Sequence, residues 1–214
     1  MSHTIVFDSE FLTAPGAKDR MWCGPLDPDP CVAQIGAVKL SLEPGFRVLE
    51  TERVFIKTAD RYGKPTVADP FFTELTGITQ AQIDAEGVRP EDAHLSLARI
   101  AGDATLWSWG KDEMFLMAVS CYVAGVAPPI PAHRFGNAAS LLNKAGMPLD
   151  DIGRTTSGEL AQYFGLPTPP GRHHDALDDA MSITVCLQHL LRTGRLDASD
   201  FELPSPKAGV MAHA

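Results

Sequence analysis

The sequence predicts one α/β domain in which helices cover the faces of a mixed sheet. Strand-like apolar runs dominate residues 4–57, and strands and helices alternate after residue 90, which is the order typical of such a fold. The chain has 214 residues, of which 44% are hydrophobic, so it can bury one good core. The sequence contains no internal repeat and no low-complexity block.

Three strands are expected early in the chain. The apolar run at residues 5–11 is typical of a buried strand, and further strands at about 32–42 and 50–57 would complete an antiparallel meander with it. Residues 13–31, between the first two strands, are rich in Pro, Gly and Asp and predict a long loop. Long loops in compact domains are often functional or mobile, so this segment is expected to lie beside a functional site.

Helices are expected mainly after residue 70. They fall at about 71–75, 79–85, 90–101, 112–123, 135–145, 157–164 and 176–192, with a fourth strand just before Gly110 and a Pro-rich break at 128–131. The tail after residue 193 is polar and has no helical period. We therefore expect one domain at 1–193 and a C-terminal tail at 194–214.

Two carboxylates share one face of the first strand. Asp8 and Glu10 are two positions apart, and side chains alternate between the faces of a strand. Like charges inside a central strand need a cation or a proton to be tolerated. Carboxylate oxygens suit a hard divalent cation such as Mg²⁺, whereas a structural zinc site would use Cys and His. The alternative is a solvated strand end with two incidental acids.

A histidine precedes an aspartate at the start of the last expected helix. His174 lies five positions before Asp179, so an imidazole on the preceding loop can lean over a carboxylate in the first helical turns. One group could then bind metal while the other takes a proton from water. His173 and Asp178 have the same spacing. The helix dipole favours Asp175 and Asp178 at this position without any function, but it does not explain two histidines.

A further acid begins the helix that follows Gly110. Asp112 stands at its first position, where an N-cap or first-turn acid commonly has no other role. Glu113 is its nearest rival for a metal-binding role, and position alone does not separate the two.

Together these segments resemble the DEDDh branch of the DnaQ-like 3′-to-5′ exonuclease superfamily, of the ribonuclease T and DNA polymerase III epsilon type. The resemblance rests on Asp8-Ser9-Glu10, on Asp112 and on residues 174–180, and it extends to the strand-like segment 33–38 and to the sequence LTGIT at 75–79. It covers about residues 4–193. It implies a ribonuclease H-like fold with a five-stranded mixed sheet flanked by helices, and identifies 1–193 as the exonuclease domain.

The resemblance also implies an activity and a set of residues. The enzyme would hydrolyse single-stranded RNA or DNA from the 3′ end and release nucleoside 5′-monophosphates, using two Mg²⁺ or Mn²⁺ ions per active site. The metal ligands would be Asp8, Glu10, Asp112 and Asp179, and His174 would be the general base. The tyrosine-type variant of the site is excluded because position 175 is Asp. Phe11 and Leu12 follow the acidic pair and are candidate contacts for the terminal nucleotide, with core packing as the alternative. The resemblance adds Leu75, Gly77 and Ile78 as substrate contacts.

The net charge of −9 restricts the partners. Phosphate contacts dominate affinity for duplex nucleic acid, so a single-stranded 3′ end or a short oligonucleotide fits this chain better than a long duplex. Two rival functions remain, a catalytically inactive nucleic-acid-binding module and a metal-dependent phosphoesterase acting on a small substrate. The second would be expected to show a Gly-rich phosphate cradle or a His-rich metal set, and the sequence has neither. The basic residues expected near the cleft are Arg134, Lys144, Arg154 and Arg172.

The remaining sequence features concern compartment and assembly. No apolar run is long enough to span a bilayer and the first residues lack the pattern of a signal peptide, so a cytoplasmic protein without membrane contact is expected. The four cysteines show no Cys-x-x-Cys spacing, which favours reduced thiols. Relatives are often dimers, which leaves a homodimer open.

Overall fold

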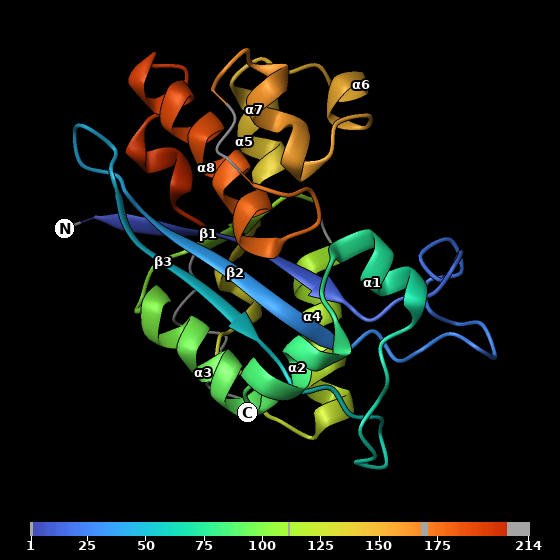
Figure 1. Cartoon of the computed structure of the whole chain (residues 1–214). Helices are drawn as coiled ribbons and strands as arrows, with labels where there is room; N and C mark the ends of the chain where they lie inside the picture. The colour runs from blue at the N-terminus through green and yellow to red at the C-terminus, as the bar shows by residue number, and fades with distance from the viewer. Residues whose placement is uncertain (1, 111, 168–170, 205–214) are drawn as a thin grey trace.

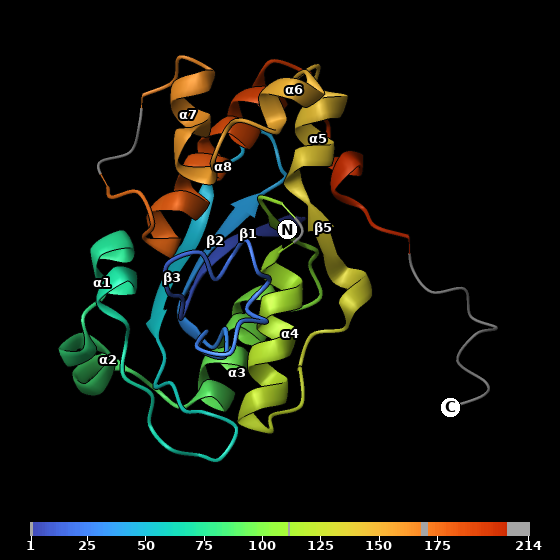
Figure 2. The same ribbon diagram turned by 90° about the vertical axis from the view of Figure 1, so that its right-hand side faces the viewer.

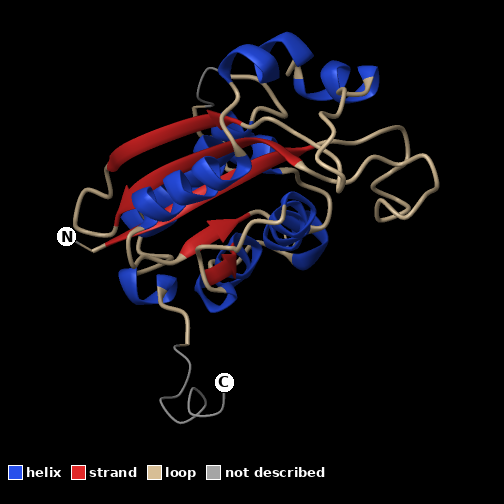
Figure 3. Cartoon of the chain, turned by 90° about the horizontal axis from the view of Figure 1, so that it is seen from below, coloured by secondary structure: helices blue, strands red, loops and turns tan. Residues whose placement is uncertain are grey.

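Five strands form one mixed sheet in the structure, a computed structural model that describes residues 2–110, 112–167 and 171–204. The strands are β1 (His3–Phe11), β2 (Val32–Ser41), β3 (Val48–Phe55), β4 (Leu106–Ser108) and β5 (Phe135–Asn137), in the order β3-β2-β1-β4-β5. β2 is antiparallel to β1 and β3, whereas β4 runs parallel to both β1 and β5. The sheet therefore has three long strands on one side and two short strands beside them (Figure 3). This arrangement confirms the predicted five-stranded mixed sheet.

Helices cover both faces of this sheet (Figures 1 and 2). One face packs on α3 (Pro90–Ala101) and α4 (Asp112–Ala124), and the other packs on α5 (Ala138–Lys144), α7 (Leu160–Tyr163) and α8 (Ala176–Arg192). Two short helices, α1 (Pro70–Thr76) and α2 (Gln80–Glu86), lie beside the end of the sheet, and α6 (Leu149–Ile152) follows α5. Short 3-10 turns at Ala132–Arg134, Ser157–Glu159 and Ala198–Phe201 complete the described elements.

The alternation along β1 decides which layer each of its side chains enters. Ile5 and Phe7 enter the core beneath α3 and α4, whereas Val6 enters the core beneath α8. Asp8 and Glu10 continue the face of Val6, because side chains two positions apart in a strand point the same way. β1 thus presents both carboxylates on the face that α8 covers.

Close packing of α8 on β2 depends on a glycine. A Cβ atom built at Gly36 would lie 2.1 Å from the backbone N of Leu177 and 2.2 Å from the backbone C of Ala176. Gly36 is the partner of Asp8 in the β1–β2 register. A missing side chain on β2 therefore lets the first turn of α8 approach the sheet beside Asp8.

We expect Gly36→Ala to destabilise the protein by about 3 kcal/mol, the upper part of the range for overpacking, because the clash is with backbone that cannot rotate away. The first turn of α8 would be pushed off the sheet, so the variant should also lose activity. Gly153→Ala is the matched control, since its Cβ would have its nearest contact at 3.6 Å and its φ of −67° is ordinary for alanine. Urea unfolding curves of both variants measure the difference, and equal midpoints would contradict the packing argument.

One region departs from the sequence-based expectation, and the structure adds packing contacts in a second. The prediction of a helix at 135–145 was wrong for its first three residues. They form β5, and α5 begins at Ala138. A Cβ at Gly136 would lie 2.5 Å from the Trp107 ring, so glycine lets β5 pair in parallel beside β4. The first part of the expected tail packs on the domain, because Leu196 and Phe201 are buried and the Phe201 ring stands edge-on to Trp107 at 5.7 Å. Residues 205–214 lie outside the described part.

Two further expectations can be compared with the structure. All four cysteines are free thiols, of which Cys23 alone is exposed. Among the residues that the structure describes, we find no helix with the length and apolar character needed to cross a membrane.

Candidate active site

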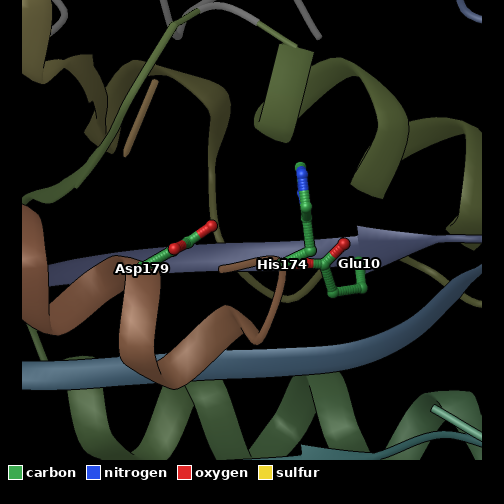
Figure 4. A group of neighbouring side chains, drawn as sticks. All are labelled: Glu10, His174 and Asp179. Carbon is green, nitrogen blue, oxygen red and sulfur yellow. The ribbon is translucent and has the colours of Figure 1, made fainter. Parts of the chain in front are cut away.

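Three side chains from distant parts of the sequence converge over the end of β1. Glu10 comes from β1, Asp179 from the first turn of α8, and His174 from the loop that precedes α8 (Figure 4). One ligand atom of each lies within 4.8 Å of the ligand atoms of the other two. This grouping of two carboxylates and an imidazole is of the size and chemistry that can hold a metal ion.

The loop before α8 is fixed by contacts with the sheet. Asp175 caps α8 by accepting hydrogen bonds from the backbone N–H groups of Leu177 and Asp178. Its carboxylate also accepts a hydrogen bond from Arg53 Nη2 at 2.7 Å. The buried side chain of Gln34 on β2 donates to Asp175 at 3.1 Å and accepts the backbone N–H of Ala176 at 2.8 Å. Asp175, which the helix dipole alone would favour at this position, thus also links α8 to two strands.

His174 takes a backbone conformation that few non-glycine residues adopt. Its φ is 62°, in the left-handed region. Ser157 Oγ donates to the carboxylate of Asp179 at 3.2 Å. Such strain persists where surrounding contacts enforce it, and here it turns the imidazole toward Glu10 and Asp179.

The second histidine, His173, also lies near Asp179. A Cβ built at Gly158 would be 2.4 Å from Nδ1 of His173 and 2.6 Å from Oδ1 of Asp179, so both groups crowd the same glycine. The positive charge of His173 lowers the pKa of Asp179. Both histidines are therefore near Asp179, but His174 is the one grouped with Glu10.

Burial and mutual repulsion raise the pKa values of the clustered carboxyls. The pKa of Asp8 lies well above its usual value because the group is buried and because Glu113, Glu10 and Asp179 are nearby. Burial, followed by the charges of Asp179 and Glu113, raises the pKa of Glu10 to about 9. Burial also raises the pKa of Asp179 to about 6, against the hydrogen bond from Ser157. These carboxyls can all ionise only if a cation offsets their repulsion.

The acid that α4 contributes to this cluster is Glu113. Its side chain is buried and accepts a hydrogen bond from the hydroxyl of Ser9, which lies between Asp8 and Glu10. Burial raises the pKa of Glu113 to about 8, and its charge acts on both Asp8 and Glu10. Asp112, predicted as the metal ligand, is exposed at the first position of the helix.

The helical phase of these two neighbouring acids differs. Glu113 is in helical phase with the buried residues of α4, which are Leu116, Met117, Ser120 and Cys121. Asp112 is in phase with Phe115 and Val119, which are apolar yet exposed, and these apolar residues obscured the buried face.

The predicted substrate contacts divide into buried and accessible residues. Leu12 and Ile78 are 2% and 3% exposed and belong to one core cluster. Their buried side chains therefore pack the residues after β1 against the LTGIT segment. Phe11, Leu75 and Gly77 are half-buried. Gly77 ends α1 with a φ of 75°, and Arg172 lies against it, because a Cβ there would be 1.8 Å from Arg172 Nη1. Arg172 also donates to the carbonyl of Glu74 at 3.1 Å.

Among the four basic residues expected near the cleft, Arg172 has the contacts that place it beside the site. Arg134 donates to the carbonyls of Gly102 and Ala104, where it ties β5 to the end of α3. Lys144 forms an ion pair with Asp200. Arg154, with its neighbours after α6, is exposed.

The fold of this chain matches solved structures of exonucleases, although no family model and no curated protein matches its sequence. The nuclease domain of 3′hExo, a DEDDh family member bound to rAMP, is 18% identical with a TM-score of 0.72, over 95% of this chain and 96% of that one. Cell-death related nuclease 4 is 19% identical with a TM-score of 0.67, over 91% of this chain and 65% of that one. A zinc-bound complex of E. coli ExoI with ssDNA is 17% identical with a TM-score of 0.61, over 90% of this chain and 41% of that one.

These likenesses establish the fold. The chain has the ribonuclease H-like fold of the DEDDh 3′-to-5′ exonucleases, as the sequence resemblance implied. At this level of identity the chemistry must be argued from the residues of the chain itself.

Proposed function

We propose that this protein is a metal-dependent 3′-to-5′ exonuclease that removes nucleoside 5′-monophosphates from single-stranded RNA or DNA. The observation that carries the proposal is the convergence of Glu10, His174 and Asp179 beside two more buried carboxyls, Asp8 and Glu113. A buried cluster of like charges with raised pKa values is costly in a structural role and suits a site for divalent cations. Solved structures of the same fold contain rAMP, ssDNA and a histone mRNA stem-loop, which supports a nucleic acid as the partner.

The donor set fits Mg²⁺ or Mn²⁺, and we propose two ions in the site. Asp8, Glu10, Glu113 and Asp179 would hold them, because carboxylate oxygens are the ligands that these hard cations prefer. Bound divalent ions would supply Lewis-acid activation of water and neutralise charge on the scissile phosphate. Glu113 replaces Asp112 in this proposal because it is the buried acid of the pair.

His174 would accept the proton of the attacking water. Burial, followed by the positive charges of His173, Lys18 and Arg172, lowers the pKa of His174, so the imidazole is in its neutral, proton-accepting form at neutral pH. The left-handed backbone at His174 fixes the direction from which the ring reaches the cluster. Arg172 and Lys18 would add positive charge where the phosphates of the substrate lie.

We expect His174→Ala to lower kcat about 10² to 10⁴-fold, which is the usual contribution of a general base, whereas His173→Ala should lower it less than about tenfold. The two variants remove the same group from adjacent positions, so each controls for the other. Single-turnover rates on a labelled oligonucleotide measure the effect. A larger loss in His173→Ala would reverse the assignment of the base.

Digestion of end-labelled substrates tests the proposed function. Single-stranded RNA and DNA oligonucleotides, each labelled at the 5′ or the 3′ end, are incubated with the protein in Mg²⁺, Mn²⁺ or EDTA. We expect a ladder that shortens from the 3′ end, releases nucleoside 5′-monophosphates and stops in EDTA. Degradation from the 5′ end would contradict the proposed polarity. No degradation in any metal would eliminate the proposal in favour of a binding module or a small-molecule phosphoesterase.

A further inference from the structure

A large hollow lies at the far end of α4 from the carboxylate cluster. Its volume is about 700 Å³. Five segments line it, namely the end of the 13–31 loop with the start of β2, residues 57–66, α2, residues 89–90, and the last turn of α4 with the residue that follows. Figure 2 shows the 57–66 segment passing below the C-terminal end of α4. The carboxylates do not line this hollow, so it is a feature separate from the candidate active site.

Three basic and two acidic side chains line the hollow, and Asp29 and Asp92 pair with two of the basic ones. Lys57, Arg61 and Arg89 contribute cations. Of the two lining acids, Asp60 is engaged by the backbone N–H groups of its own loop, and Asp84 accepts the amide of Gln80. The side chains of Arg61 and Arg89 are 61% and 71% exposed within their ion pairs. Such exposed pairs contribute little free energy, so a phosphate can compete for both guanidinium groups.

Two of the three tyrosines in the chain stand at this hollow. Tyr122 lines it and is 84% exposed, and Tyr62 lies between two lining residues and is 88% exposed. Arg61 is close enough to both that their hydroxyls influence its pKa, which they raise after the larger effects of Asp29. Exposed aromatic rings beside cations are the elements with which proteins hold unpaired bases and their backbone.

An exposed face of α4 runs from Asp112, the neighbour of the buried Glu113, toward this hollow. Phe115, Val119 and Tyr122 share one face of the helix and are exposed. Glu113 and Tyr122 are nine residues apart, which corresponds to roughly 13 Å along the helix axis, or about four stacked nucleotides. A strand whose 3′ end lies at Glu113 could therefore follow α4 to the hollow.

We propose that this hollow is an upstream subsite that holds single-stranded nucleic acid about four nucleotides from the 3′ end. The proposal rests on the proposed exonuclease function and extends it to substrate length. Tyr122 stacks on a base, and Arg61 and Arg89 contact phosphates. The chain has a net charge of −9, which repels nucleic acid in general. Basic side chains at the hollow would provide local contacts with phosphates.

Binding measured without turnover tests the subsite independently of catalysis. Fluorescence anisotropy in EDTA compares 5′-labelled octanucleotides with dinucleotides, each as RNA and DNA. We expect the octanucleotide to bind at least tenfold more tightly, and Tyr122→Ala to remove roughly tenfold of its affinity while leaving dinucleotide affinity unchanged. Tyr163→Ala is the matched control, because Tyr163 is the third tyrosine and lies on α7. Arg61→Ala should reduce the slope of log affinity against log salt by about 0.7, the value for one phosphate on a single strand.

The possible outcomes separate this proposal from the exonuclease proposal. Equal affinity for the two lengths, or no loss in Tyr122→Ala, would overturn the subsite even if the protein digests 3′ ends. Length-dependent binding that Tyr122→Ala abolishes would support the subsite even if no digestion occurs. Sedimentation velocity of the wild type and Tyr122→Ala provides a third result. A change from dimer to monomer would identify the face as an interface between copies and overturn the proposal.

Discussion

Replacing Glu113 with Gln is expected to lower kcat/KM on a single-stranded oligonucleotide about 10³-fold, whereas Asp112→Asn should lower it less than about tenfold. Loss of a metal-binding carboxylate removes several kcal/mol of transition-state stabilisation, and each 1.36 kcal/mol is a factor of ten in rate. Glu113 is buried between the other acids and Ser9, while Asp112 faces solvent. Initial rates in saturating Mg²⁺ measure both variants.

The two substitutions are well matched, since each exchanges a carboxylate for its amide at neighbouring positions of α4. Folding is checked by circular dichroism, and metal affinity by calorimetry. The expected signature is a loss of metal affinity in Glu113→Gln alone. If Asp112→Asn caused the larger loss, α4 would have to rotate when metal binds, and the acid predicted from the resemblance would be the ligand after all.

The contrast between these two residues shows what sequence patterns can and cannot predict here. Asp8 and Glu10 were predictable as a pair, because the two-residue period of a strand fixes their common face. The approach of His174 and Asp179 to that face depends on Gly36, whose missing Cβ lets α8 pack closely. A local pattern identifies a glycine without indicating which helix will occupy its space. The choice between Asp112 and Glu113 is likewise a matter of helix rotation, set by the packing of Leu116 and Met117.

The architecture was more predictable than its smallest elements. Long strands and long helices bury enough periodic apolar surface to be recognised, and β1 and α8 are examples. β5 has three residues, too few for a period, and it forms because Gly136 fits beside Trp107. Phe201 is buried through contact with Trp107, almost a hundred residues away, so no local pattern could have shown that this part of the tail packs on the domain.

The second large effect concerns stability. Asp8→Asn is expected to abolish hydrolysis and also to stabilise the metal-free protein at pH 8 by at least about 1 kcal/mol, or roughly 2 to 4 °C in Tm. In the absence of metal, Asp8 is a buried acid whose ionised form is opposed by burial and by Glu113, Glu10 and Asp179. Asparagine keeps the shape and removes the charge, so the variant should relieve a repulsion that the wild type retains for function.

The dependence on pH follows from the direction of the pKa shifts. Burial and neighbouring carboxylates raise the pKa of Glu10 to about 9 and, with burial again the main cause, that of Glu113 to about 8, whereas the unfolded chain has ordinary values near 4.5. The folded protein therefore binds more protons than the unfolded one, and this part of its stability is complete below the unfolded pKa and is lost as pH rises toward 9. The difference in Tm between Asp8→Asn and wild type should accordingly grow between pH 5 and pH 9.

Divalent metal should reverse the order of the two proteins. At a free Mg²⁺ or Mn²⁺ concentration of 100 times Kd, binding to the folded state stabilises the wild type by about 2.7 kcal/mol, or roughly 5 to 10 °C in Tm, whereas Asp8→Asn should gain much less.

Thermal scans of both proteins at several pH values, each with EDTA or with metal, measure these differences. Leu95→Ala, an exposed position on α3, controls for general effects of substitution and should respond to metal as the wild type does. A wild type that gains nothing from either ion, or an Asp8→Asn protein that gains as much, would remove the metal site from Asp8. Since the same carboxylates that destabilise the metal-free fold would hold the ions, loss of stability without metal and activity with metal must have the same origin in this site.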